Sequence, residues 1–428
     1  MGQVRLWTAQ GALNGCRRSA VQARELLTDV ANPPEVHLFP RSDGPGSSQD
    51  LPQFAAMGTR LPGAFDFSDP SWAWSRECLR TPGACIDGEP IVYRILPAEN
   101  PDAFEYYSPD FHDEPLVVTG EVPGEVRFFV HNVLAQFGLR GLRIEADPMP
   151  SVYRGTGLGG SNLAHGGAMI LASALTGADL SLGQIYIAAT QNENYFGVTE
   201  RGPDHLEYGV SLTGGQETLT AFQGGFWDNV HVGHLLGPYS VVSRELVAPD
   251  GYADVARHMA LINVGAKRGQ GVTSSGVNHV WMKAWRDPKL VGQHIGKREL
   301  AYRASEALRH GDWPTYCSAV RSYREARTEL CAAYLNGQDE LGQLCERYGV
   351  EYFPLGGGSG TCMVCGEDEA AVASVVDAVR ETADPSAGRT ALEFAVRENG
   401  LEMRHFEECG LEEPAGPEEI ESAEQNAA

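Results

Sequence analysis

The sequence is short of basic residues. Over 428 residues it has 33 lysines and arginines against 57 aspartates and glutamates, which gives a formal net charge of −24. A nucleic-acid-binding protein normally carries a basic stripe or patch, and the sequence has none. An acidic surface also repels anionic membranes, so a site for a phosphate-bearing ligand has to be built locally from backbone dipoles and bound cations. We therefore expect neither nucleic acid nor a membrane as a partner.

Long apolar runs and a cysteine framework are missing as well. No apolar run reaches the roughly 18 residues needed to span a bilayer, and the first residues, MGQVRLWTAQGALNG, lack the basic-then-apolar layout of a signal peptide. Nine cysteines are scattered along the chain, and the close pair Cys362 and Cys365 has no second pair at zinc-ligand spacing. These absences predict reduced thiols, buried in a strand, and a cytoplasmic protein.

The composition is that of a mixed helix and strand protein with many loops. Hydrophobic residues make up 42% of the chain and glycine contributes 50 residues, and the length allows two or more packed domains. The acidic segment 411–428 is expected to be disordered. Residue patterns predict strands at 89–96, 141–147, 259–266 and 400–406, a strand or helix start at 126–134, and helices at 161–175, 181–195, 299–313, 322–335 and 369–381.

The stretch PSVYRGTGLGGSNLA (150–164) is open to more than one interpretation. Gly155, Gly157 and Gly160 spell the G-x-G-x-x-G of a dinucleotide site, but the preceding strand ends near Asp147 and the following helix leads into another helix. A helix entry that merely tolerates glycine is a second alternative. The third, which the pattern favours, is a phosphate cradle in which glycine amides converge on an anion at a helix N-terminus. Ser161 would then cap that helix or hold magnesium.

This stretch resembles the central motif of the GHMP kinases, and it is most similar to that of the fucokinase and heptose-kinase branch. The resemblance implies that the loop binds the phosphates of ATP and that Ser161 helps to hold Mg²⁺. The residues that it assigns to ATP are Arg154, Gly155, Thr156, Gly157, Leu158, Gly159, Gly160, Ser161 and Asn162.

Three further segments follow the order of the family's motifs. RLPGAFDFSDP (60–70) is similar to the first motif, LTGGQETLTAFQGGF (212–226) to the branch's G-G-x-Q-D-Q segment, and FPLGGGSGTCM (353–363) to the third motif. The resemblance places Glu217 at the catalytic aspartate, and LINVGAKRGQG (261–271) places Arg268 at the family's arginine. It also assigns to the site the third-motif residues Gly356, Gly357, Gly358, Ser359 and Gly360.

The metal and acceptor residues are assigned less uniquely. Glu193 matches the second magnesium ligand of the family, with Glu207 as a rival. Asp66 and Gln216 are the other acceptor-binding candidates. In QGGFWDNVHVGH (223–234), Trp227 offers a stacking face, and Asp228 or Asn229 a hydrogen bond to a sugar hydroxyl. The same segment is equally well interpreted as a core strand with polar edges.

The sequence departs from the family at several positions. Ala64 replaces the first motif's arginine, Gly160 and Asn162 replace hydroxyl residues, and Phe353 replaces the third motif's lysine. Glu217 replaces aspartate, and an extra methylene shifts a carboxylate by about 1 Å, which can cost on the order of 100-fold in rate. Taken alone, a carboxylate beside a Gly-Gly pair is either a general base or a solvated turn residue.

The resemblance implies an α+β, two-domain architecture with the active site in the cleft between the lobes. We expect an extension at 1–57, an ATP-binding domain at 58–240 and a second domain at 241–410. The implied activity is Mg²⁺-dependent transfer of the ATP γ-phosphate to a hydroxyl of a sugar or polyol. The alternatives are a catalytically silent relative that binds a ligand to regulate a partner, and an NAD-dependent oxidoreductase. The sequence does not predict the oligomeric state.

Overall fold

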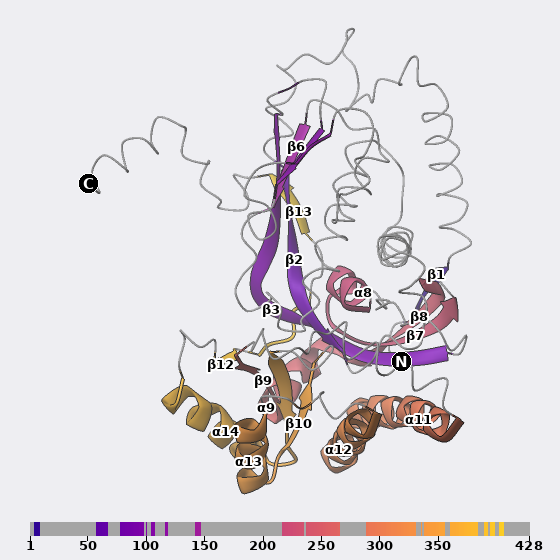
Figure 1. The fold of residues 1–428 in the computed structure, drawn as a ribbon, viewed down its shortest axis with the longest axis vertical. Helices are drawn as coiled ribbons and strands as arrows, with labels where there is room; N and C mark the ends of the chain where they lie inside the picture. Colours follow the sequence, from indigo (N-terminus) through magenta and orange to yellow (C-terminus); the bar gives the residue numbers. More distant parts are fainter. Residues whose placement is uncertain are drawn as a thin grey trace.

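The computed structural model of the chain describes a set of separate segments. These are residues 4–8, 57–66, 78–97, 100, 104–107, 116–118, 142–146, 216–234, 237–265, 288–330, 335, 338–355, 360–383, 389–392, 394–398 and 402–405. They form two β-sheets with helices packed against them (Figure 1).

The larger sheet has nine strands among the described residues. Their bounds are β1 (Val4–Thr8), β2 (Met57–Asp66), β3 (Cys78–Pro97), β4 (Phe104–Tyr107), β5 (Leu116–Val118), β6 (Leu142–Ala146), β7 (Phe226–His234), β8 (Gly237–Val247) and β13 (Glu402–His405). The order is β1-β8-β7-β3-β6-β4-β5, and β2 pairs with both β3 and β13. All pairs are antiparallel except β4 with β6.

The long strand β3 organises this sheet. One stretch, Cys78–Ala84, pairs with β7, and the far end, Tyr93–Pro97, pairs with β6. Along its other edge β3 pairs with β2, with a break in register between Leu61 and Gly63. The strand is therefore shared by two parts of the sheet, and it brings chain segments far apart in sequence into one hydrogen-bonded layer.

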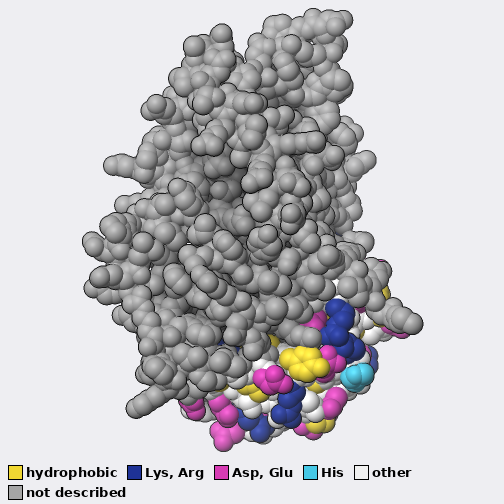
Figure 2. All heavy atoms as spheres, turned by 90° about the vertical axis from the view of Figure 1, so that its right-hand side faces the viewer, with side chains coloured by type: hydrophobic (Ala, Val, Ile, Leu, Met, Phe, Trp, Pro, Cys, Tyr) yellow, Lys and Arg dark blue, Asp and Glu magenta, His cyan; other side chains and the backbone are white. Residues whose placement is uncertain are grey.

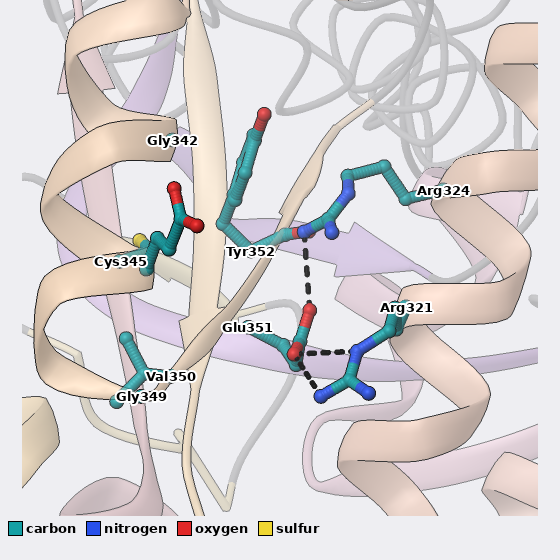
Figure 3. Close-up of a pocket in the computed structure, with 9 residues that line it drawn as sticks. Arg321, Arg324, Gly342, Cys345, Gly349, Val350, Glu351 and Tyr352 are labelled. Atoms are coloured by element: carbon teal, nitrogen blue, oxygen red, sulfur yellow. Dashed lines mark hydrogen bonds and ion pairs between the residues drawn. The ribbon is translucent and has the colours of Figure 1, made fainter.

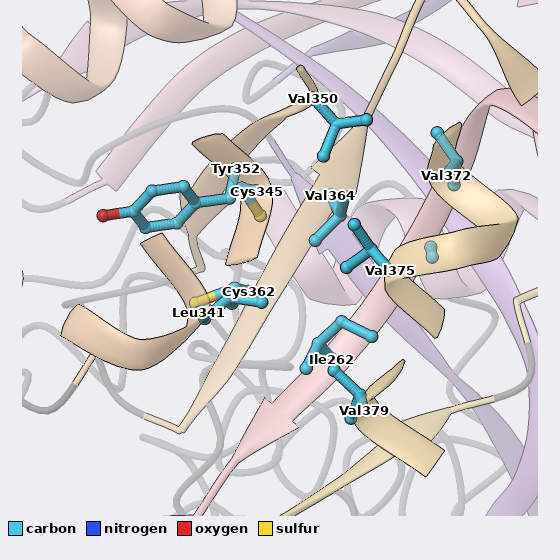
Figure 4. Packing of buried hydrophobic residues seen from close by; sticks show 11 residues of the cluster. Ile262, Leu341, Cys345, Val350, Tyr352, Cys362, Val364, Val372, Val375 and Val379 are labelled. Atoms are coloured by element: carbon cyan, nitrogen blue, oxygen red, sulfur yellow. The ribbon is translucent and has the colours of Figure 1, made fainter. Parts of the chain in front are cut away.

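The smaller sheet is built from β9 (Met259–Val264), β10 (Glu351–Pro354), β11 (Thr361–Cys365) and β12 (Arg389–Leu392), in the order β10-β11-β9-β12 with every pair antiparallel. Two helices, α13 (Asp339–Tyr348) and α14 (Glu369–Glu381), contribute to the apolar cluster that covers it (Figure 4). The members of that cluster include Ile262, Cys345, Val364, Val375 and Val379, all at most 1% exposed. Strands β9, β10 and β11 are buried over nearly their whole length, whereas α13 and α14 each bury one apolar stripe with helical spacing.

Four other helices lie close to the sheets. They are α8 (Gln216–Gln223), the short α9 (Tyr252–His258) preceded by a 3₁₀ turn (Pro249–Gly251), α11 (Pro288–His310) and α12 (Trp313–Leu330). Helices α11 and α12 pack side by side, with α11 against β3 and β8 and α12 against β10 (Figure 1).

Most of the predicted elements within the described residues are confirmed. The strands predicted at 89–96, 141–147, 259–266 and 400–406 correspond to β3, β6, β9 and β13, and helix α14 has the predicted bounds 369–381. Cys362 and Cys365 lie in β11, where both are buried and unbridged, as predicted. The predictions at 126–134, 161–175, 181–195 and 411–428 fall outside the described residues.

The two helices predicted at 299–313 and 322–335 need correction. The first begins at Pro288 and ends at His310, and the second begins at Trp313 and ends at Leu330. The break falls at Gly311, whose φ of 63° is left-handed, and Asp312, whose carboxylate accepts a hydrogen bond from the amide of Thr315. A left-handed glycine ends one helix and a capping aspartate starts the next.

Three strands of the larger sheet cross or connect the predicted boundaries of the extension and the domains. Residues 4–8 of the extension form β1, which pairs with β8 at the edge of the larger sheet. The boundary between 240 and 241 falls inside β8, and β13 returns to the larger sheet from the end of the chain. The two-domain division itself stays a prediction.

Two further properties of the described residues concern membrane-spanning helices and the distribution of surface charge. None of its helices is both long and apolar enough to cross a membrane. Where Figure 2 shows described side chains at the surface, acidic and basic groups are intermixed and a basic patch is not seen on that face.

Candidate functional site

Helix α8 and the turn after it form the best-described part of the predicted site. Gln216 and Glu217 are the first two residues of α8, which ends at Gln223 and is followed by Gly224 and Gly225. Both glycines have left-handed φ values, 67° and 71°. A Cβ on Gly225 would lie 2.6 Å from the Tyr252 hydroxyl, so this turn requires glycine for both its conformation and its space.

Glu217 therefore lies in the first turn of a helix, where the sequence had suggested either a general base or a turn residue. The helix packs against β2 and β3. The carboxylate of an acidic residue in a first turn is stabilised by the positive end of the helix dipole. The assignment of Glu217 as the base stays a prediction.

The register of the larger sheet brings a second predicted residue to the same region. Asp66, the last residue of β2, pairs with Gly83 of β3, and Gly83 pairs on its other side with Trp227 of β7. These three residues form one row across the sheet, directly after the Gly224–Gly225 turn. Segments of the chain some 160 residues apart thus meet beside α8.

Trp227 and Asp228 are both buried, at 3% and 0% exposure. The indole nitrogen of Trp227 donates a hydrogen bond to the Gly224 carbonyl. Asp228 is paired with Arg244 at 2.9 Å and accepts a hydrogen bond from Ser305 of α11 at 3.2 Å. This burial favours the core-strand interpretation of 223–234 over an open sugar-binding surface.

A chain of buried polar side chains fixes α8 to the β7–β8 pair. Gln223 Nε2 donates to Ser243 Oγ at 2.6 Å, and Ser243 Oγ donates to Asn229 Oδ1 at 2.6 Å. Asn229 Nδ2 in turn donates to Thr220 Oγ1 at 3.4 Å. All four side chains are at most 8% exposed. We call this set the polar chain.

Successive residues of β7 serve opposite faces of the sheet. Asp228 contacts α11, whereas Asn229 contacts α8, as the period of two in a strand requires. This part of the sheet is thus held between two helices, and each helix is fixed by a buried polar contact. Neither the polar chain nor the Asp228–Arg244 pair was predicted from the sequence. The presence of Asn and Asp inside an otherwise strand-forming run was the available signal.

The third glycine segment connects two neighbouring strands of the smaller sheet. It leaves β10 after Pro354 and enters β11 at Thr361, and Gly360 at its end has a φ of 75°. Phe353, which stands where the resembling motif has lysine, is fully buried with its ring edge-on to Tyr323 at 5.4 Å. The fully buried guanidinium of Arg327 lies 5.4 Å from the centre of the Phe353 ring.

Many predicted site residues lie outside the described residues. They are Arg154, Gly155, Thr156, Gly157, Leu158, Gly159, Gly160, Ser161, Asn162, Glu193, Glu207, Arg268, Gly356, Gly357, Gly358 and Ser359. For Asp66, Gln216 and Glu217 the structure describes the backbone position.

A separate pocket of about 520 Å³ lies between α12, α13 and β10 (Figure 3). Glu351 accepts hydrogen bonds there from Arg321, with its Nε at 2.8 Å, and is paired with Arg324 at 3.2 Å. The guanidinium of Arg324 also covers the Tyr352 ring at 4.4 Å. Burial raises the pKa of the Tyr352 hydroxyl, with the Arg324 charge opposing that rise. The basic groups of this pocket are already paired with Glu351, and no residue predicted for the site lines it.

Comparisons with known proteins identify the fold through solved structures and not through sequence matches. No protein-family model matches the chain, and no curated protein sequence matches it. Solved structures do match over most of the chain.

Three of these structures illustrate the likeness. A D-glycero-D-manno-heptose 1-phosphate kinase from Bacteroides thetaiotaomicron aligns with a TM-score of 0.52 and 14% identity, covering 81% of this chain and 98% of that one. A galactokinase from Lactococcus lactis, complexed with galactose, aligns with a TM-score of 0.59 and 11% identity, covering 83% and 98%. A mevalonate diphosphate decarboxylase from Staphylococcus aureus aligns with a TM-score of 0.54 and 13% identity, covering 81% and 98%.

The chain thus has the α+β fold of the GHMP kinases. Identities of 11–14% show the fold alone, and the decarboxylase among the matches indicates that one fold serves more than one reaction. The site residues have to decide which reaction this chain carries out.

Proposed function

We propose that the protein is a Mg²⁺-dependent kinase that transfers the γ-phosphate of ATP to a hydroxyl of a sugar or sugar-like polyol. Two independent lines support the proposal. The sequence has four segments that resemble GHMP kinase motifs in the family's order, and the structural matches include kinases named for a heptose phosphate and for galactose.

The observation that carries the proposal is the placement of α8. The helix begins with Gln216 and Glu217 and packs against β2, which ends at Asp66. The two segments proposed to bind and activate the acceptor are therefore neighbours in space, although about 150 residues separate them in the sequence.

Each residue has a distinct task in the proposed reaction. The carboxylate of Glu217 accepts the proton of the acceptor hydroxyl, whose oxygen forms a bond to the γ-phosphorus while the bond to the leaving ADP oxygen breaks. Asp66 and Gln216 orient the acceptor. Residues 154–162 would hold ATP and Ser161 with Glu193 would hold Mg²⁺, which neutralises charge on the transferred phosphate. Arg268 would stabilise the same charge.

A second candidate is a protein of this fold that binds a nucleotide without turning it over. The glutamate at position 217, where the resembling motif has aspartate, favours it because a longer side chain displaces the base. The two candidates differ in turnover and agree in nucleotide binding.

Nucleotide binding is tested by thermal unfolding of the full chain with ATP plus Mg²⁺, ATP plus EDTA, NAD⁺ or buffer. A ligand at 100 times its Kd that binds only the folded state adds about 2.7 kcal/mol, a rise in Tm of several degrees. We expect a rise that needs both ATP and Mg²⁺ and that is reduced in Ser161→Ala. A rise with NAD⁺ alone contradicts the proposal, and a rise with ATP but no ADP release for any sugar supports the silent relative.

A further inference from the structure

A group of metal-ligating side chains lies well away from the residues discussed so far, where α9 meets the start of α14. Asp254 and His258 are four residues apart on α9 and so share one face of that helix, and Glu369 is the first residue of α14. One possible ligand atom from each lies within 4.8 Å of the others. We call this group the Asp254–His258–Glu369 cluster.

The imidazole of His258 is held rigidly. Its side chain is only 9% exposed, and its ring stacks on Trp313 with centroids 4.3 Å apart and planes at 15°. Its Nδ1 lies 2.9 Å from the Gly366 carbonyl oxygen. A carbonyl oxygen only accepts, so Nδ1 carries the hydrogen and, in the neutral ring, Nε2 carries the lone pair. A backbone carbonyl that fixes the tautomer in this way is typical of metal-binding histidines.

The exposed edge of the ring faces a carboxylate. Nε2 lies 3.6 Å from Glu369 Oε1, a separation longer than a hydrogen bond but within the range of an ion pair when the imidazole is protonated. A lone pair and a carboxylate oxygen repel each other when they face each other without a cation between them. The arrangement calls for a proton or a metal ion at this position.

Arg257 lies at the outer side of the cluster and supplies one positive charge. Its NH2 group lies 2.8 Å from Asp254 Oδ1, and its Nε lies 3.0 Å from Glu369 Oε1. Its side chain is half exposed, so it is free to turn into solvent. With a neutral imidazole, the two carboxylates and the guanidinium together carry a net charge of −1. If the guanidinium moves away, the remaining charge of −2 is balanced by one divalent ion.

We propose that the Asp254–His258–Glu369 cluster binds a divalent transition-metal ion of the zinc type. Nε2 of His258 and one carboxylate oxygen each from Asp254 and Glu369 are the ligands, and water completes the coordination. One imidazole with two carboxylates suits zinc, whereas magnesium and calcium prefer oxygen ligands alone. His258 is the last residue of α9, where the negative end of the helix dipole favours a cation.

The bound ion would connect α9 to α14 and so clip together two elements that flank the smaller sheet. Arg257 occupies the cluster when the ion is absent and competes with it. This competition gives the proposal a consequence that an ordinary ion-pair network does not have. Removing the charge of Arg257 should tighten metal binding, although it removes two ion pairs.

The test is a titration of the untagged, EDTA-treated full chain with ZnCl₂ at pH 7.5 without nucleotide, followed by thermal unfolding. We expect the wild-type Tm to rise by at least about 3 °C at saturation. Glu369→Gln should raise the apparent Kd for zinc at least about tenfold. Arg257→Gln should lower this Kd. Asp377 has an exposed carboxylate on α14, as Glu369 does, and Asp377→Asn should leave the Kd unchanged.

Several results overturn the proposal. They are the absence of a wild-type response, equal responses of wild type and Glu369→Gln, and binding by Arg257→Gln as weak as that by Glu369→Gln. Asp254→Asn is a second ligand variant if Glu369→Gln does not fold. Zinc held by cysteines elsewhere would act equally in all these variants, and Co²⁺ bound to the cluster should lack thiolate charge-transfer absorption. The outcome does not depend on whether the protein is a kinase.

Discussion

The described parts of the two sheets differ in how much buried polar side chains contribute to their packing. The smaller sheet is covered by an apolar cluster from β9, β10, β11, α13 and α14, in which the cysteines pack as small hydrophobic side chains (Figure 4). In the larger sheet, α8 is hydrogen-bonded to β7 and β8 through the polar chain of Thr220, Gln223, Asn229 and Ser243, and Asp228 of β7 is paired with Arg244 of β8. An apolar core tolerates substitutions that keep its volume, whereas a buried hydrogen-bond chain rigidifies and specifies one arrangement.

This difference corresponds to two proposed roles: the larger sheet positions the catalytic residue, and the smaller sheet provides a stable support. The element that carries Glu217 is the one that the polar chain fixes, and a catalytic group has to be held within about 0.5 Å of its working position. The smaller sheet contributes a stable support and the connection that holds residues 356–360. We therefore expect substitutions in the smaller sheet to lower mainly stability and substitutions in the polar chain to lower mainly activity.

The largest loss of stability is expected in the apolar cluster. Ile262 is 1% exposed in the middle of β9. Ile262→Ala should lower the free energy of unfolding by about 2–5 kcal/mol because it removes buried methylenes and leaves a cavity, and Ile262→Val should cost about 0.5–1.5 kcal/mol. Urea unfolding measures both. Near-normal turnover of folded Ile262→Ala would support the two separate roles of the sheets. Equal losses of unfolding free energy in the two Ile262 variants would contradict cavity formation as the cause.

The polar chain should show a smaller loss of stability and a larger loss of activity. Asn229→Leu removes the acceptor of the Ser243 hydroxyl, a loss that costs about 1–3 kcal/mol, and also a long bond of 3.4 Å to Thr220 that contributes little. We expect kcat to fall more than Ile262→Ala lowers it, because α8 shifts. Ser374→Ala, which removes an exposed hydrogen bond of 2.8 Å, is the matched control and should be neutral. Unchanged kcat in Asn229→Leu would contradict a role of the polar chain in positioning α8.

The smallest effect is a dependence on alkaline pH that belongs to the smaller sheet. Burial raises the pKa of the Cys345 thiol to about 12, so the folded state keeps its proton above pH 9 while the unfolded state loses it. Stability must then fall as pH rises, and at pH 10 this thiol accounts for about 1.4 kcal/mol. Urea unfolding at pH 8 and pH 10 measures the loss. Cys345→Ala should lose less between the two pH values, and an equal loss would rule out this thiol as the cause.

Part of the apolar framework could be predicted from the sequence because its signals are local, although helix α13 and strand β10 were not predicted. Helix α14 matched its predicted bounds since its apolar period is regular and Asp368 caps it, its carboxylate accepting from the Ala370 amide. The break between α11 and α12 was misplaced because a buried Trp313 begins a helix as readily as it ends one.

The arrangement around α8 could not be predicted in the same way. An eight-residue helix between two glycine pairs has little intrinsic stability and forms through tertiary packing. The row of Asp66, Gly83 and Trp227 depends on strand pairing over long sequence distances, and the polar chain joins residues 9 to 20 positions apart. The cluster at His258 likewise requires two helices to meet, so neither feature has a local pattern.

The most direct test of the account is phosphoryl transfer by the full chain. Mg²⁺-dependent ADP release is measured with ATP and a panel of hexoses and heptoses, and ³¹P NMR identifies the phosphorylated product. We predict sugar-dependent ADP release that falls about 100-fold or more in Glu217→Gln while ATP–Mg²⁺ still raises its Tm. Sugar-dependent turnover that is unchanged in Glu217→Gln would contradict the role of α8, and sugar-independent ATP consumption would contradict the proposed acceptor.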